Sequence, residues 1–233
     1  MKRITLFIDA DDTLLDFDAA ETRAINQTLK DYDLLKYDNI IERYKVNNLK
    51  AWKMFEANEL ERDDISTVRF KWLFDEYGIT GIGYKDINDL YWSYLAKGAD
   101  VIEGAREFLE KVKNEYDLYV ITNGTAFIQD SRFKLSDMSK YFKKRYISEN
   151  LNTRKPEKAF IDYIEKDING IDYENTYIVG DSLSSDIQLG INSGIKTIWF
   201  NRENEQNTKN IIPNYEVKSF EELYDLIEKI RKE

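Results

Sequence analysis

The sequence predicts a protein of the α/β class, with a doubly wound parallel sheet and a helical insert. Two observations lead to this class. Short apolar runs recur along the chain, and helical patterns separate most of them, as expected for parallel strands that are buried on both faces. One interval departs from this alternation, because the roughly one hundred residues after the first run read as helix throughout.

Five apolar runs are predicted to form the sheet. In chain order they are Ile4–Ile8, Leu118–Ile121, Arg145–Ile147, Tyr177–Val179 and Lys196–Phe200. A final amphipathic helix is expected over Glu221–Glu233, where Leu223, Ile227 and Ile230 recur at helical spacing. The core is therefore expected to be a Rossmann-like sheet covered by helices.

The interval between the first two strands is expected to form a separate domain. Its apolar residues recur mostly at spacings of three and four, which predicts helices over Ala19–Tyr32, Ile40–Ala57, Ile65–Tyr77 and Ile87–Leu95. We expect a core of residues 1–16 and 101–233 and an inserted four-helix cap of residues 17–100. The alternative is a helical excursion that packs on the sheet and takes no part in substrate binding.

Composition narrows the possible chemistry. The chain has no histidine and no cysteine, which excludes imidazole bases, thiolate nucleophiles and disulfides and leaves carboxylates, lysine, tyrosine, threonine or a hard metal. A net charge of −10 argues against binding to a nucleic-acid polymer. No apolar stretch approaches membrane-spanning length, so we expect a cytoplasmic protein without a membrane partner. Monomer and homodimer both remain open.

Acids and a hydroxyl group follow the first two predicted strands. Asp9, Asp11 and Asp12 come directly after an apolar run, and three acids this close repel one another unless a cation or a proton offsets them. Thr122 ends the second strand and can donate a hydrogen bond to a phosphate oxygen. Ligands bind at the carboxyl ends of parallel strands, so both segments are candidate sites. Each also fits a plain turn, an Asp N-cap in the first and an Asn-Gly turn in the second.

Two further segments add a cation and more acids. Lys155 precedes a predicted helix and could supply a fixed positive charge for a phosphate, although surface lysines are common. Asp181 follows the fourth strand and Asp186 comes five residues later, a pair that could complete an oxygen-rich Mg²⁺ site or simply cap a βα loop. We expect the first and fourth strands to be neighbours, because Asp9 and Asp181 must reach one ion.

In this order, the segments resemble the motifs of the haloacid dehalogenase-like (HAD) superfamily. The pattern is Asp-x-Asp-x-Thr at residues 9–13, Thr122 after an apolar strand, Lys155-Pro156, and Gly180-Asp181 followed by Asp186. The resemblance implies that Asp9 is a nucleophile that forms an aspartyl phosphate. It implies that Asp11 is the general acid that protonates the leaving oxygen and then activates water. Members that release halide lack this second aspartate, so dehalogenation is not expected.

The resemblance also implies a phosphate site and a metal site. The phosphate is expected to contact Thr122, Asn123 and Lys155, and Thr122 and Lys155 also count among the catalytic residues. An Mg²⁺ cofactor is implied, whose expected ligands are Asp9, the backbone carbonyl of Asp11, and Asp181. Asp186 is expected to support these ligands from a second layer or through water.

A narrower likeness is to the bacterial pyrimidine 5′-nucleotidase branch of the superfamily. Asp12 stands where most members have glycine, and the run Asp-Ala-Asp-Asp-Thr-Leu at residues 9–14 is similar to that branch, as are residues 48–70 and 190–194. Asn58 and the pair Thr153-Arg154 depart from it. A nucleoside 5′-monophosphate phosphatase is therefore expected. A phosphatase or mutase for small sugar or acid phosphates such as phosphoglycolate, and a non-catalytic binder of a phosphorylated ligand, are the alternatives.

Two residues of the expected cap are candidate substrate contacts. Arg69 could hold the base or sugar of a nucleotide, and Trp52 could stack on a base. The alternative for Arg69 is an internal ion pair, and the alternative for Trp52 is a place in the core of the cap.

Overall fold

The computed structural model describes residues 3–208 and 210–232, and the chain divides into two compact units. The sheet unit consists of residues 1–16 and 100–233, and the helical unit of residues 17–99. The division differs from the expected one by a single residue. Asp100 goes with the sheet unit, where its carbonyl oxygen accepts a hydrogen bond of 3.0 Å from the backbone N–H of Asp16. Residues 1, 2, 209 and 233 of the expected core lie outside the described residues.

Among the described residues, a six-stranded parallel sheet in the order β3-β2-β1-β4-β5-β6 forms the centre of the sheet unit. Its strands are β1 (Thr5–Asp9), β2 (Asp117–Thr122), β3 (Lys144–Ile147), β4 (Thr176–Gly180), β5 (Lys196–Phe200) and β6 (Tyr215–Val217). The expected contact between the first and fourth strands is confirmed, because β1 pairs with both β2 and β4. The strand order reverses beside β1, which is where ligands bind in open α/β sheets.

The strand β6 is an addition to the five expected strands. It pairs with β5 at the edge of the sheet over only three residues, and the middle one, Glu216, is exposed. A three-residue edge strand with a charged centre lacks the apolar run by which the other strands are recognised.

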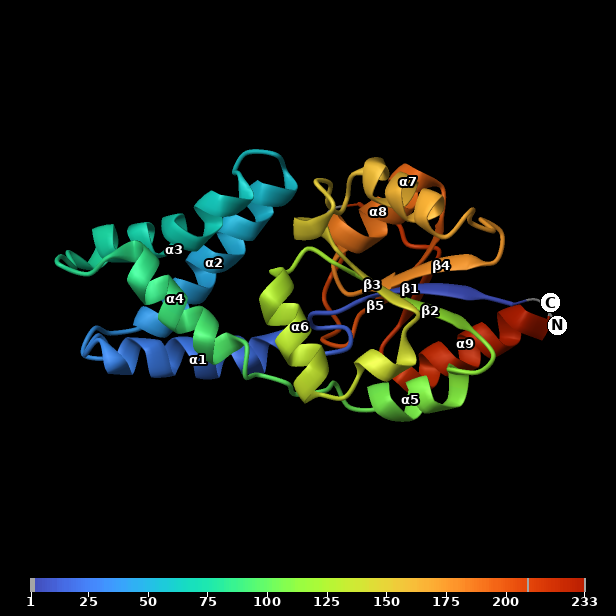
Figure 1. Ribbon diagram of the computed structural model, residues 1–233, viewed down its shortest axis with the longest axis horizontal. Coiled ribbons are helices and arrows are strands. Elements are labelled where there is room, and N and C mark those ends of the chain that lie inside the picture. Colours follow the sequence, from blue (N-terminus) through green and yellow to red (C-terminus); the bar gives the residue numbers. More distant parts are fainter. Residues whose placement is uncertain (1–2, 209, 233) are drawn as a thin grey trace. The chain divides into compact units, whose positions relative to one another are not determined.

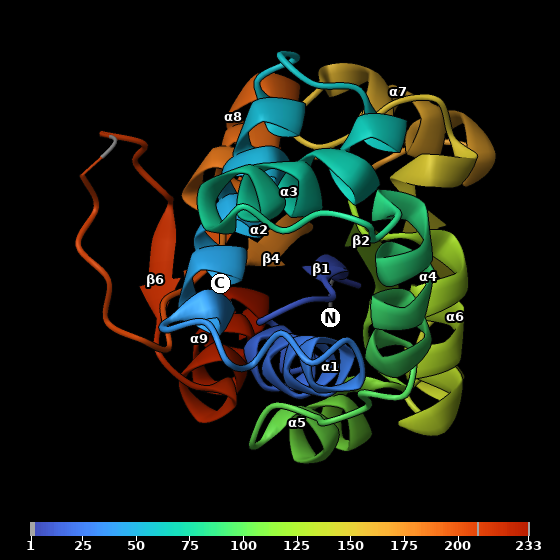
Figure 2. The ribbon, with the colours of Figure 1, turned by 90° about the vertical axis from the view of Figure 1, so that its left-hand side faces the viewer.

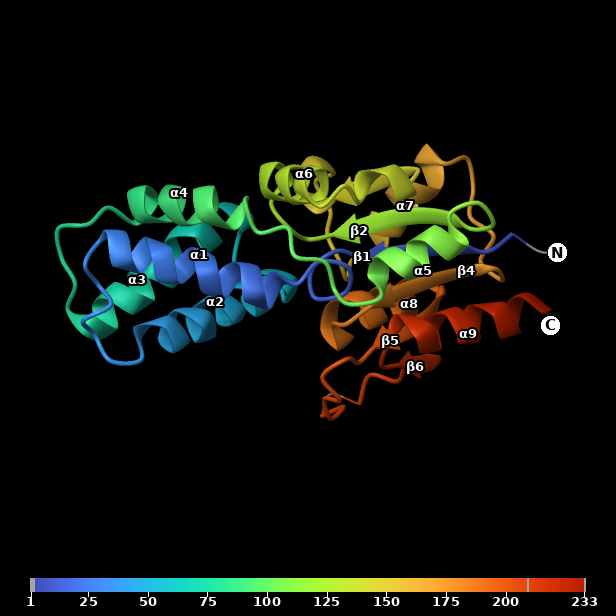
Figure 3. The same cartoon turned by 90° about the horizontal axis from the view of Figure 1, so that it is seen from below.

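Helices cover both faces of the sheet. They are α5 (Ala105–Val112), α6 (Ala126–Leu135), α7 (Lys158–Asp167), α8 (Gln188–Ser193) and α9 (Phe220–Lys232). Side chains of β1 alternate between the faces. Leu6 and Ile8 pack with residues of α5 and α9, which lie along the same face in Figure 3, whereas Phe7 packs with residues of α7 and α8. The sheet is thus buried on both sides, as the continuous apolar strands predict.

The helical unit consists of α1 (Phe17–Asp31), α2 (Ile40–Glu56), α3 (Arg62–Tyr77) and α4 (Tyr84–Leu95), all within its fully described residues. Helix α1 packs on α4 and α2 packs on α3 (Figures 1 and 2). Tyr44, Phe70 and Tyr91 pack against one another in its interior with tilted or edge-on rings whose centroids lie 5.0–6.2 Å apart. Helices α3 and α4 begin earlier than expected, because their first turns carry charged residues and little apolar pattern. None of the helices described is long and apolar enough to cross a membrane.

Candidate active site

Three carboxylates meet at the carboxyl ends of β1 and β4. Asp9 is the last residue of β1, Asp181 directly follows β4, and Asp186 lies in the π-helical turn Leu183–Ile187. One carboxylate oxygen of each lies within 4.8 Å of those of the other two. Asp9 and Asp186 are buried, and Asp181 is partly exposed. The neighbouring positions of β1 and β4 therefore bring Asp9 and Asp181 close enough to share one ion.

Lys155 places a buried positive charge among these acids. Its ammonium group donates to Asp9 Oδ1 and lies 2.7 Å from Asp186 Oδ1. The side chain is 3% exposed, so water screens these contacts very little. Asn123 fixes the backbone of Lys155 by accepting from its N–H at 3.0 Å and donating to its carbonyl oxygen at 2.9 Å. The predicted contact between Asn123 and a phosphate stays a prediction.

Burial and the neighbouring charges shift the pKa values of this cluster. Burial raises the pKa of Asp9 well above its ordinary value although Lys155 opposes the rise, and the nearby acids raise it further. Burial also raises the pKa of Asp181, with help from the charges of Asp186 and Asp12. Burial alone lowers the pKa of Lys155, but Asp186 and Asp9 reverse this and raise it above its ordinary value. Three carboxylates lie beside a single lysine, so Lys155 alone does not balance their negative charge when all three are ionised.

An oxygen-only donor set with excess negative charge fits Mg²⁺, which prefers carboxylate and water oxygens. Asp186 has both oxygens engaged, Oδ1 by Lys155 and Oδ2 by the backbone N–H of Ser182 at 3.1 Å. That arrangement suits the supporting role expected for Asp186. Gly180 makes room for it, because a Cβ at Gly180 would lie 2.2 Å from Asp186 Cγ.

Thr13 and Trp199 hold Asp181, and sequence reasoning assigned a role to neither. The buried hydroxyl of Thr13 donates to Asp181 Oδ1 and accepts from the backbone N–H of Asp181, both at 3.1 Å. The indole N–H of Trp199 donates to the Asp181 carbonyl oxygen at 2.7 Å. Thr13 was visible as part of the first motif. Trp199 carried no signal, because an aromatic residue in a strand reads as core.

The unusual Asp12 has a backbone explanation. Its φ is 58°, in the left-handed region, and its N–H donates to the carbonyl oxygen of Leu15 at 2.8 Å. Glycine adopts this conformation most easily, and aspartate tolerates it better than most residues. Aspartate at position 12 thus meets a backbone demand that glycine would also meet.

Thr122 is positioned to donate a hydrogen bond. Its hydroxyl oxygen accepts from the backbone N–H of Gly124 at 2.9 Å, and the side chain is buried at the end of β2. A hydroxyl group carries one proton and two lone pairs, so this contact leaves its proton for another acceptor.

The Asp11 carboxylate is bound apart from the other acids. Arg132 of α6 donates to Oδ1, and Gln129 of the same helix donates to Oδ2 at 2.6 Å. Neither residue was expected at the site. A single arginine or glutamine on an amphipathic helix normally reads as part of its solvated face.

Comparison with known proteins decides the family. A model of the haloacid dehalogenase-like hydrolases matches residues 6–200, which run from the second residue of β1 to the end of β5. The chain belongs to this family. It is therefore a hydrolase, and the fold and the motifs expected from the sequence agree with this assignment.

Relatives of this HAD hydrolase resemble it over nearly its whole length. The HAD-hydrolase YfnB of Bacillus subtilis is 35% identical, with 97% of each chain covered. The pyrimidine 5′-nucleotidase PynA of Streptococcus pneumoniae is 37% identical, with 96% of this chain and 94% of PynA covered. A crystal structure of YfnB, described as bound to magnesium and as revealing interdomain movement, superposes with a TM-score of 0.90. That comparison has 33% identity and covers 97% of this chain and 99% of the YfnB chain.

In the helical unit of this HAD hydrolase, Arg69 lies in a buried polar network. Its guanidinium donates to Asn48 Oδ1 at 2.7 Å and to Asn88 Oδ1 at 2.6 Å. Asn48 in turn donates to Glu21 at 2.5 Å. Trp52 is partly buried, with its ring edge-on to Phe55 at 5.8 Å. Both residues thus make contacts inside the unit, and their contact with substrate stays a prediction.

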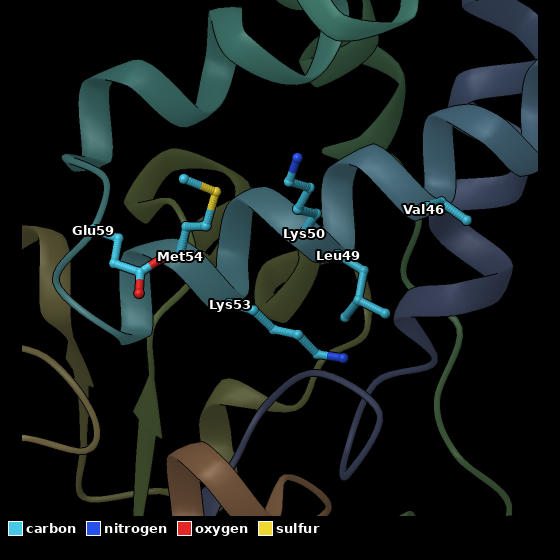
Figure 4. Close-up of a pocket in the computed structure, with 6 residues that line it drawn as sticks. All are labelled: Val46, Leu49, Lys50, Lys53, Met54 and Glu59. Carbon is cyan, nitrogen blue, oxygen red and sulfur yellow. The ribbon is translucent and has the colours of Figure 1, made fainter.

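A surface groove lies elsewhere on the helical unit. Figure 4 shows the side chains that line it, from α2 and the segment after it: Val46, Leu49, Lys50, Lys53, Met54 and Glu59. The groove combines apolar surface with two lysines. Neither Arg69 nor Trp52 lines it.

The buried Glu21 predicts a pH-dependent stability. Burial raises its pKa from 4.5 to about 7, although Arg69, Lys45 and Asn48 oppose the rise and Asp18 adds to it slightly. Because the folded-state pKa is the higher one, its stabilising effect is complete below pH 4.5 and is lost as the pH rises through 7. We expect Glu21→Gln to remove a decline of about 3 kcal/mol over this range.

Thermal unfolding of wild type and Glu21→Gln between pH 4.5 and 8 measures this effect. The exposed residue Glu42 on α2 offers a control, Glu42→Gln. An equal pH slope in wild type and Glu21→Gln would contradict the prediction.

Proposed function

We propose that this HAD hydrolase is an Mg²⁺-dependent phosphomonoesterase that acts through an aspartyl phosphate on Asp9. The observation that carries the proposal is the position of Asp9 at the end of β1, bound by buried Lys155 and within 4.8 Å of two further acids. A carboxylate that attacks a phosphate dianion meets like-charge repulsion, so it requires concentrated positive charge beside it. Lys155 provides one such charge, and a bound Mg²⁺ would add Lewis-acid neutralisation of the remainder.

The chain's own residues account for each proton and bond of the reaction. Lys155 binds Asp9 Oδ1, which leaves Oδ2 to attack phosphorus. The new Asp9–phosphorus bond forms as the bond to the leaving oxygen breaks, and Asp11 gives that oxygen a proton. Asp11 then takes a proton from water as the water attacks phosphorus and releases Asp9. Thr122 and Lys155 orient and neutralise the phosphoryl oxygens throughout.

The proposed substrate is a nucleoside 5′-monophosphate with a pyrimidine base. PynA and a second relative, YjjG of Escherichia coli at 26% identity, are both named pyrimidine 5′-nucleotidases. Phosphate release from a panel of nucleotides, sugar phosphates and phosphoglycolate, with Mg²⁺ present, tests this proposal. A higher kcat/KM for pyrimidine nucleotides supports this substrate assignment. A higher kcat/KM for a sugar or acid phosphate overturns it. Failure to hydrolyse a generic aryl phosphate would overturn the proposal that the protein is a phosphomonoesterase.

Activity is expected to require Mg²⁺, to be lost with a chelator, and to recover poorly with Ca²⁺. Ca²⁺ takes more ligands at longer distances, which displaces the reacting groups. A second readout is independent of activity, because a ligand at 100 times its Kd stabilises the folded state by about 2.7 kcal/mol. We expect Mg²⁺ to raise the melting temperature of wild type but not that of Asp181→Asn.

The control for this measurement is Asp162→Asn, which removes an acid that pairs with Lys158 on the surface. Its melting temperature should respond to Mg²⁺ as wild type does. Full turnover in chelator, or an undiminished shift in Asp181→Asn, would contradict the metal site.

A further inference from the structure

Two buried residues of α6 donate hydrogen bonds to the carboxylate of Asp11. Gln129 and Arg132 are three residues apart and therefore lie on the same side of the helix. They are 1% and 0% exposed. Arg132 donates to one oxygen of Asp11 and Gln129 donates to the other at 2.6 Å. The two contacts together fix both the position and the plane of the carboxylate.

Neighbouring groups contact the side chains of Arg132 and Gln129 and leave room for them. A second nitrogen of Arg132 lies 3.4 Å from the carbonyl oxygen of Asp16, and Gln129 Nε2 lies 3.4 Å from the Thr122 hydroxyl. A Cβ at Gly124 would lie 2.3 Å from Gln129 Nε2, so the glycine leaves the space that the amide occupies. Burying a guanidinium costs several kcal/mol unless it is paired, and here Asp11 is its carboxylate partner.

The hydrogen bonds from Arg132 and Gln129 leave acceptor positions on the Asp11 carboxylate for proton transfer. Each carboxylate oxygen has two lone pairs, and one hydrogen bond to each oxygen leaves the second available. The Asp11 side chain is also 26% exposed, whereas that of Arg132 is fully buried. The Asp11 side chain is thus bound by α6 without being fully buried.

We propose that Arg132 and Gln129 are positioning residues that hold Asp11 in the orientation needed for proton transfer to the leaving oxygen. The inference rests on the proposed function, in which Asp11 is the general acid. Proton transfer depends steeply on placement, because a misdirected carboxyl group must reorient before it can reach the leaving oxygen. Loss of these two contacts should therefore lower the rate most for substrates whose leaving group most needs a proton.

The test compares two substrates that differ in this need. A nucleotide leaves as a poor alkoxide leaving group, whereas p-nitrophenyl phosphate leaves as a stabilised phenolate. General acid catalysis contributes ~10²–10⁴-fold, so we expect Arg132→Met to lower the single-turnover rate of phosphoryl transfer by about 10²-fold for the nucleotide and by less than about 5-fold for the aryl phosphate. Arg132→Lys should restore part of the difference, because it can renew only one of the contacts.

Gln129→Met provides a second variant in case Arg132→Met unfolds, because it removes a neutral amide rather than a buried charge. It should show the same bias toward the nucleotide with a smaller loss. Asp130→Asn is the matched control on the same helix, since Asp130 pairs with Arg145 at the surface. It should leave both rates unchanged. Single-turnover rates avoid the masking effect of slow phosphoenzyme hydrolysis.

A double-mutant cycle with Asp11→Asn separates this inference from the proposed function. If Asp11→Asn shows the substrate bias and Arg132→Met adds nothing to it, Arg132 acts through Asp11. If Asp11→Asn shows the bias but folded Arg132→Met and Gln129→Met slow both substrates equally, the positioning role is overturned. If Asp11→Asn itself slows both substrates equally, the acid role of Asp11 is wrong and the inference falls with it.

Discussion

Asp9→Asn is expected to abolish turnover of every phosphate ester, whatever its leaving group. The substitution keeps the shape of the side chain but removes the carboxylate that would bond to phosphorus. The fold should survive, because Lys155 keeps its contact with Asp186 and burial already disfavours the charge of Asp9. The expected result is a loss to the level of the uncatalysed reaction, with a melting temperature equal to or above that of wild type.

Acid-quenched wild-type protein should carry a phosphoryl group on Asp9, detected by mass spectrometry after brief mixing with substrate. Asp9→Asn should carry none. The control Asp162→Asn removes a carboxylate on the surface of α7 and should retain both turnover and phosphoenzyme. Measurable turnover in Asp9→Asn with a wild-type dependence on substrate would refute covalent catalysis at this residue.

Lys155→Met is expected to damage both catalysis and stability. It leaves Asp9 and Asp186 buried without their cation, and breaking a buried pair in this way costs about 3–5 kcal/mol. Turnover should fall to near background, because the phosphate dianion and Asp9 would repel each other. Added Mg²⁺ should recover more stability in this variant than in wild type, since the excess negative charge is larger.

Chemical denaturation with and without Mg²⁺ measures these effects. Lys158→Met offers a matched control, because Lys158 pairs with Asp162 at an exposed site and such pairs contribute less than about 1 kcal/mol. Equal losses of stability in Lys155→Met and Lys158→Met would contradict the buried role of Lys155.

The sequence was sufficient to predict five of the six strands described and the clustering of Asp9 and Asp181 beside them. Five of the strands are short apolar runs, and the contact between β1 and β4 follows from requiring Asp9 and Asp181 to meet. These features are local, because each motif lies where a strand ends. The edge strand β6 was missed because its three residues lack an apolar run.

Residues that act through tertiary packing could not be predicted in the same way. Arg132 and Gln129 sit more than a hundred residues from Asp11 in the chain, and only the fold brings them together. The fold also creates the two hydrogen bonds between the Asn123 amide and the backbone of Lys155, which the sequence does not reveal. A motif identifies which residue types end a strand, but it does not show which partners hold them.

The contact between Gly180 and Asp186 restricts how the sequence can vary. Any side chain at position 180 would occupy the space of the Asp186 carboxylate, so the two positions are not independent. A mutational path that exchanges Gly180 first collides with Asp186, and a path that shortens Asp186 first leaves Lys155 without one of its two carboxylate partners. Both intermediates on the way to a double replacement are thus disfavoured, and the pair is expected to be exchanged together or not at all.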